Sequence, residues 1–197
     1  MCDYKTFTLH KGTNISHWLS QSSRRGIERE VFFTKSDVAY LAGLGCDHLR
    51  IPIDEEQMFD EAGNPEPEAF ELLTSALDWC WEEDLRAIVD LHILRSHHFN
   101  EDEKPLWTNP AEQERFMDLW RVLSDTLRSY PNGMLAYELM NEPVADDPQK
   151  WNQLVALAIN VIREHEPERV IVVGSNRWQS ADTFDELLVP KNDSNIL

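Results

Sequence analysis

The segment from Tyr137 to Pro143 closes a short apolar run with an amide, a carboxylate and a proline. The run before it, residues 134–137, suits a buried strand. Pro143 forbids further ladder pairing, so Asn141 and Glu142 fall at the carboxyl end of that strand. In a parallel α/β barrel the chemistry sits at this end of the strands. Glu142 is therefore the leading candidate for a catalytic residue.

Other apolar runs also end in polar or aromatic side chains. Taken singly, each has a structural explanation: a buried ion pair for the arginine, a structural hydrogen bond for the histidine, core or rim packing for the tryptophans. Their place at corresponding strand ends favours a functional reading. These residues are His17 and Trp18 after the first run, Arg50 at the second, His92 at the third and Trp178 after the fifth.

Strand-like and helix-like segments alternate along the chain. Alternation of this kind, without hairpin signals, predicts a parallel sheet with crossover helices. The expected strands cover residues 12–18, 46–53, 86–92, 134–140 and 169–174, and the expected helices 34–45, 70–85, 109–127 and 147–162. A helical turn is expected near 184–188, and residues 195–197 begin a sixth strand.

Both a doubly wound sheet and a (β/α) barrel fit this order of elements. No Gly-rich phosphate loop follows the first strand, and no Walker sequence is present, which weakens the nucleotide-binding version. The sequence therefore favours an incomplete (β/α)8 barrel of five to six βα units, with residues 1–197 forming one domain.

The composition narrows the possible partners. The formal charge of -18 argues against nucleic acid and anionic membrane surfaces. No stretch approaches the roughly 20 apolar residues of a membrane helix. The first five residues show neither a basic region nor an apolar core typical of a signal peptide, which predicts a cytoplasmic protein, or a secreted or periplasmic one if a leader was removed. Cys2, Cys46 and Cys80 are expected to be reduced thiols, with a lipid anchor on Cys2 as the alternative.

The segment 93–107 is an unusually long loop, and it carries His97, His98 and Trp107. Loops of this length are usually functional or disordered. Because this loop follows the strand that ends at His92, the two histidines become candidates for substrate contact.

Asn141-Glu142-Pro143 at the end of a fourth strand resembles the signature of glycoside hydrolase family 5, the cellulase-like family of clan A. The resemblance extends to Arg50, His92 and the tryptophan at Trp178, and it covers five strands and the start of a sixth. It implies a retaining glycosidase acting on a β-linked glucan or related carbohydrate, with neither metal nor cofactor.

The resemblance also implies roles for these residues. Glu142 would be the acid/base, and Asn141 would bind the sugar 2-hydroxyl. Arg50 would hold the nucleophile and lower its pKa. His92 would contact the sugar, and Trp178 would stack on a sugar face. Trp18, His97 and His98 are further candidates for substrate binding.

One part of the family pattern is missing from this sequence. The nucleophile of such enzymes is a glutamate at the end of the seventh strand, whereas this chain reaches only the start of a sixth. Glu138 precedes Glu142 by four residues, which is about 13 Å in an extended strand and too far for the roughly 5–5.5 Å of a retaining pair. The missing strands would come from a longer or second chain or another copy of this one, or the chain would be inactive.

Two other functions compete with hydrolysis by this family's mechanism. A sugar-binding module would use Trp18, Trp107 and Trp178 without turnover. A metal-dependent barrel hydrolase would use His92, His97 and His98, although the sequence has no H-E-x-x-H motif.

Overall fold

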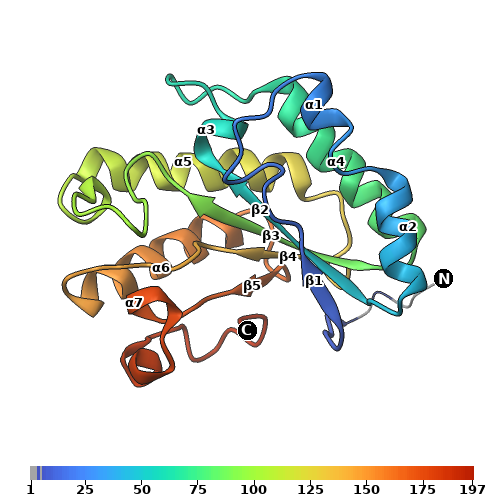
Figure 1. The fold of residues 1–197 in the computed structure, drawn as a ribbon. Helices are drawn as coiled ribbons and strands as arrows, with labels where there is room; N and C mark the ends of the chain where they lie inside the picture. The colour runs from blue at the N-terminus through green and yellow to red at the C-terminus, as the bar shows by residue number, and fades with distance from the viewer. Residues whose placement is uncertain (1–3, 5) are drawn as a thin grey trace.

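Five parallel strands form a single sheet in the order β1-β2-β3-β4-β5 (Figure 1). The computed structural model describes residue 4 and residues 6–197, so the alternative for Cys2 lies outside the described residues. The strands are β1 (Gly12–Asn14), β2 (His48–Asp54), β3 (Arg86–Ile93), β4 (Leu135–Glu138) and β5 (Val170–Val172). The predicted parallel alternation is confirmed.

Helices connect successive strands and cover the outer side of the sheet (Figure 1). The longer ones are α2 (Lys35–Gly43), α4 (Pro67–Glu82), α5 (Pro110–Leu127) and α6 (Pro148–Arg163). Short helical segments complete the chain: α1 (Ile27–Glu30), α3 (Glu55–Met58), η1 (Pro105–Trp107), α7 (Asn176–Gln179) and η2 (Ala181–Glu186). None of the helices in the described part of the chain is long and apolar enough to cross a bilayer.

The ends of the long helices follow local sequence signals. Asn109 and Asp147 each accept a hydrogen bond from a backbone N–H of the first turn, at 3.0 and 2.9 Å, and a proline follows each of them. The Asp37 carboxylate accepts from the Thr34 N–H at 2.8 Å, as in a capping box at the start of α2. Gly45 takes a φ of +81° after α2, a conformation that suits glycine.

Side chains alternate between the two faces of the sheet because successive residues of a strand point to opposite sides. In β3, Ala87, Val89 and Leu91 join the large core under the helices. Ile88 faces the inner side, where it forms a smaller apolar cluster with Ala136 and Val170. Two residues beyond Ile88, Asp90 of β3 lies opposite Glu138 of β4 in the strand register. The inner face therefore changes from apolar to charged toward the carboxyl ends of the strands.

A buried polar network fixes β4 and β5 to α5 and α6. Glu166 accepts from Ser124 Oγ at 2.7 Å, from Tyr137 Oη at 2.9 Å and from Arg169 Nε at 2.7 Å. Arg169 is fully buried and also donates to three backbone carbonyls. Since every charged group in it is paired, the network joins these elements without a buried, unpaired charge.

Several elements of the structure can be compared directly with those expected from the sequence. A sixth strand begins as expected, because Ile196 pairs with Ile171 in parallel. The second strand runs to Asp54, so Arg50 lies in its middle rather than at its carboxyl end. The one-turn helices α1 and α3 were not among the expected helices.

Candidate active site

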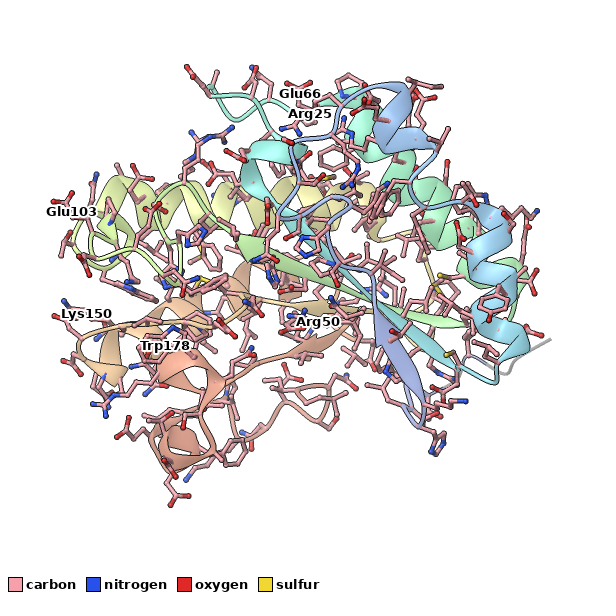
Figure 2. All side chains as sticks on the ribbon, viewed as in Figure 1. Arg25, Arg50, Glu66, Glu103, Lys150 and Trp178 are labelled. Carbon is pink, nitrogen blue, oxygen red and sulfur yellow. The ribbon has the colours of Figure 1, made fainter. Side chains whose placement is uncertain are left out.

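Arg50 is the centre of a charged cluster on the inner face of the sheet (Figure 2). Its guanidinium donates to both carboxylate oxygens of Glu138, from Nε at 2.7 Å and from Nη2 at 2.9 Å. Nη2 also lies 2.8 Å from Asp90 Oδ2 and 3.0 Å from Asn141 Oδ1. A long side chain that starts inside β2 thereby connects the ends of β3 and β4.

Asp90 links this cluster to His92. The two residues are two apart in β3, so they share a face, and His92 Nδ1 lies 2.6 Å from Asp90 Oδ2. A carboxylate at Nδ1 favours the proton on that nitrogen, which leaves Nε2 directed away from the cluster. His92 is half-buried and packs edge-to-face against Phe99, with 6.1 Å between ring centroids.

Burial and mutual repulsion set the proton affinities in this cluster. Asp90 is fully buried; desolvation and the neighbouring Glu138 carboxylate raise its pKa to about 6. Burial opposes the Arg50 charge, but the hydrogen bonds to Glu138 and the charges of Asp90, Glu138 and Glu142 outweigh it and raise the pKa of Arg50. One guanidinium thus balances several carboxylates.

Asp90→Asn is expected to change how stability depends on pH. The folded state binds a proton on Asp90 more tightly than the unfolded state, so this residue contributes stability that is present below about pH 4 and is lost as pH rises through about 6. The free energy of unfolding of the wild type, measured with urea between pH 4 and 8, should fall relative to that of the variant across this window. Parallel curves would contradict the assignment. The exposed Asp125→Asn serves as control.

Asn141 and Glu142 lie where β4 gives way to a turn. The Asn141 N–H donates to the Leu91 carbonyl at 3.2 Å, so the chain still runs beside β3 at this point. Asn141 is buried, whereas Glu142 is half-buried and takes a φ of +48°. A glutamate rarely adopts this left-handed conformation, which costs of order 1–3 kcal/mol and requires support from its surroundings.

Trp178 reaches this edge from a left-handed turn after β5. Arg177, Trp178 and Gln179 have φ of 53°, 59° and 58°. The Trp178 N–H donates to the Pro143 carbonyl at 3.2 Å, and its indole Nε1 donates to the Phe99 carbonyl at 3.3 Å. Trp178 thus joins the loops after β3 and β4 through its indole and its backbone, and the residue stays 53% exposed (Figure 2).

Gln179 turns inward from the same segment. Its amide donates to Glu138 Oε1 at 3.2 Å. Gly174 leaves the space for it, because a Cβ at that position would lie 2.4 Å from the Gln179 side chain. The loop after β5 therefore contributes to both the charged cluster and the exposed rim.

A cleft of about 970 Å³ lies on the β1–β3 side of the same edge. His98 lines it together with His17, Asp54 and Arg95. Arg95 is held in place by Glu55, whose carboxylate accepts from the Arg95 backbone N–H at 2.9 Å and from its Nη1 at 3.0 Å. His98 as a substrate contact stays a prediction.

Two residues predicted to bind substrate are placed where they cannot do so. Trp18 is fully buried, packs on Phe33 and donates its indole N–H to the Arg29 carbonyl at 2.9 Å. His97 is 1% exposed, and its ring packs edge-to-face on Trp107. Neither offers a surface to a sugar, so both predictions are wrong. Each ring packs on an aromatic side chain and makes a hydrogen bond with the backbone, which accounts for its burial.

The sequence reasoning missed Asp90 and Glu138 as partners of Arg50. Both lie in strands that are otherwise apolar, and charged residues are rarely buried unless they are paired. That rule, applied to two acids and one arginine in neighbouring parallel strands, could have found the cluster. The histidines proposed as metal ligands diverge, and no group of three potential ligands exists among the described residues.

Comparisons with known proteins show the family to which this chain belongs. The family model Cellulase (glycosyl hydrolase family 5) matches residues 9–197. Endoglucanase C of Acetivibrio thermocellus is 30% identical over 182 residues, which cover 89% of this chain and 52% of the relative. Cellodextrinase A of Ruminococcus flavefaciens is 30% identical over 193 residues, covering 96% of this chain and 57% of the relative. The chain thus spans little more than half the length of these relatives.

Solved structures agree with the sequence matches. The cellulose synthase subunit Z of Clostridioides difficile superposes with a TM-score of 0.81 at 26% identity, covering 96% of this chain and 60% of the other. Cel5A of Thermotoga maritima, in complex with cellobiose, superposes with a TM-score of 0.79 at 26% identity, covering 96% and 59%. The five-stranded sheet corresponds to part of a (β/α)8 barrel, and the predicted fold is confirmed. The chain belongs to glycosyl hydrolase family 5.

Proposed function

We propose that this chain carries the acid/base half of a retaining glycosidase that acts on a β-linked glucan. The observation that supports this most directly is Glu142, half-buried at the carboxyl edge of the sheet, next to the Arg50 cluster. The relatives include endoglucanases and a cellodextrinase, which favours a glucan as substrate. Glu142 protonates the leaving oxygen and later takes a proton from water.

The hydrogen bonds of the cluster prepare two neighbours for this reaction. Because Asn141 Oδ1 accepts from Arg50, the Asn141 amide nitrogen is left to donate to the sugar 2-hydroxyl. Because Asp90 holds His92 Nδ1, the His92 Nε2 is left for a sugar hydroxyl. Both residues keep their orientation before substrate arrives, which lowers the cost of binding it.

Trp178 supplies the apolar surface of this proposed site. Sugars present flat C–H faces, and a half-exposed indole is suited to stacking on one of them. The bonds to the Pro143 and Phe99 carbonyls hold the indole beside the turn that carries Glu142. His98, with the cleft that it lines, extends the polar surface for further sugar units.

A retaining enzyme needs a second carboxylate about 5–5.5 Å from the first. Asp90 and Glu138 both bind Arg50, and both are buried, so neither is free to attack a sugar. We therefore place the nucleophile on a segment that completes the barrel, in a longer chain or in a second polypeptide. Arg50 is the group that would contact it.

The second candidate function is carbohydrate binding without turnover. It is favoured by the same engagement of Asp90 and Glu138, because a site with one free carboxylate can hold a sugar but cannot form the glycosyl-enzyme intermediate. The exposed Trp178 ring serves binding and catalysis equally well.

Calorimetry and product analysis on cellohexaose distinguish these functions, with the chain assayed together with the segment that completes the barrel. The proposal predicts heat of binding together with release of reducing ends, and NMR should show products that first form as the β-anomer. Binding without reducing ends supports the binding module. No binding at concentrations up to the millimolar range contradicts both functions.

A further inference from the structure

His97 lies beneath the turn that carries Glu142. It belongs to the loop between β3 and α5, where Leu94 and His97 exchange two backbone hydrogen bonds of 3.1 Å. Its ring packs edge-to-face on Trp107, with 5.3 Å between centroids, and Trp107 packs on Trp151 of α6 at 6.3 Å. Since the backbone and the ring are both fixed, the His97 imidazole has a defined position.

The imidazole contacts the turn through one atom. Nε2 lies 3.1 Å from the Val144 backbone nitrogen, and the Val144 N–H donates to it. Val144 comes two residues after Glu142, and His97 is 47 residues earlier in the chain. For Nε2 to accept this bond the ring must be neutral with its proton on Nδ1. Burial, assisted by the positive charges of Lys104 and His98, lowers the His97 pKa to about 4 and keeps it neutral.

Hydrogen bonds from neighbouring loops hold the turn after Glu142. Asn176 Oδ1 accepts from the Ala145 N–H at 2.8 Å, and its Nδ2 donates to the Ala145 carbonyl at 2.9 Å. Trp178 binds the Pro143 carbonyl. His97 holds the opposite side, from the loop after β3. A strained φ of +48° at Glu142 persists only where such contacts outweigh its cost.

We propose that His97 is a positioning residue: by accepting the Val144 N–H, it fixes the turn and thereby the place of the Glu142 carboxyl group. The inference rests on the proposed function of Glu142 as acid/base. It gives His97 a task that a buried side chain can perform. Loss of the acceptor frees the turn on its β3 side, and a displacement of about 1 Å at a catalytic group can cost about 100-fold in rate.

Two substitutions separate the hydrogen bond from the packing. His97→Phe keeps an aromatic ring against Trp107 but removes the acceptor, while His97→Gln keeps an acceptor oxygen at similar reach. Ser124→Ala is the matched control, because it also removes one buried hydrogen bond, to Glu166 on the helix side of the sheet. His97→Phe and Ser124→Ala should each lower the free energy of unfolding by about 1 kcal/mol. A simple loss of folded protein would therefore affect both variants equally.

The first readout, taken with the barrel-completing segment present, is kcat/KM on cellotetraose compared with 2,4-dinitrophenyl cellobioside. A sugar leaving group needs the proton from Glu142, whereas dinitrophenolate leaves without one. His97→Phe should therefore lower kcat/KM on cellotetraose by about 10- to 100-fold more than on the dinitrophenyl substrate. His97→Gln should recover most of that difference, and Ser124→Ala should show none. Equal losses on both substrates would show a merely structural role and overturn the proposal.

The second readout requires no turnover. In NMR spectra of the ¹⁵N,¹³C-labelled chain, His97→Phe should shift the Val144 amide proton upfield, speed its exchange with solvent and move the Glu142 backbone resonances. Ser124→Ala should leave these signals in place. If His97→Phe leaves the Glu142 resonances unchanged, the proposal is wrong whatever the activity. If the wild type, assayed with the segment that completes the barrel, hydrolyses neither substrate, the proposed function fails, and these resonances alone decide the positioning.

Discussion

Glu142→Gln, assayed with the segment that completes the barrel, is expected to lower the rate of β-glucan hydrolysis by about 10²- to 10⁴-fold, the usual contribution of a general acid. Glutamine has nearly the same shape and keeps the turn, but it carries no proton for the leaving oxygen. Binding of cellohexaose should change little, because Asn141, His92 and Trp178 keep their positions. The measurement pairs initial rates of reducing-end release with calorimetric titration of the same preparation.

A retaining mechanism also predicts how this loss can be reversed. On 2,4-dinitrophenyl cellobioside, Glu142→Gln should retain glycosylation, and added azide should accelerate turnover and yield a β-glycosyl azide, because azide needs no general base. Glu164→Gln, at the exposed end of α6, is the matched exchange and should leave the rate unchanged. A Glu142→Gln variant with a rate within twofold of the wild type would rule out the acid/base role.

Of the substitutions proposed, Arg50→Met should cause the largest loss of stability, about 3–5 kcal/mol near neutral pH. Methionine fills a similar length but leaves the buried Asp90 and Glu138 without their cation. The folded-state pKa of Asp90 then rises further above that of the unfolded chain. The destabilisation should therefore be smaller at pH 5 than at pH 8, since protonation removes the unpaired charge.

Urea unfolding at pH 5 and pH 8 tests this expectation. Arg121→Met is the control: Arg121 pairs with Glu114 and Asp118 on the exposed face of α5, and such pairs contribute at most about 1 kcal/mol. Arg50→Lys should fall between, because a lysine keeps the charge but cannot bind Glu138 through two parallel hydrogen bonds. A loss at Arg50→Met no larger than at Arg121→Met would contradict the central role of this cluster.

The long-range order of the fold was predictable because it depends on periodicity. Apolar runs of strand length, separated by amphipathic helices, indicate a parallel sheet, and the caps at Asn109 and Asp147 mark where helices begin. The one-turn helices α1 and α3 escaped prediction. A four-residue helix has no periodicity to detect, and its formation depends on contacts from elsewhere, such as Glu55 with Arg95.

The candidate site residues also differ in how far the sequence could predict their positions. Asn141 and Glu142 could be placed at the strand end because proline terminates the ladder. For a tryptophan or a histidine, the residue type alone cannot tell an exposed ring from a buried one. Trp18 turns into the core because Phe33 and the Arg29 carbonyl provide a site for it. Trp178 stays at the surface because three consecutive left-handed residues carry it outward.

The contacts that hold the Glu142 turn have a consequence for synthesis of the protein. His97, Asn176 and Trp178 all precede the start of the sixth strand in the chain. Chains emerge from the ribosome with the N-terminal portion first, and folding can begin on that portion. Once residue 179 has left the exit tunnel, the contacts of His97, Asn176 and Trp178 with the turn can all form. The geometry of the Glu142 turn thus needs none of the segments that follow residue 179.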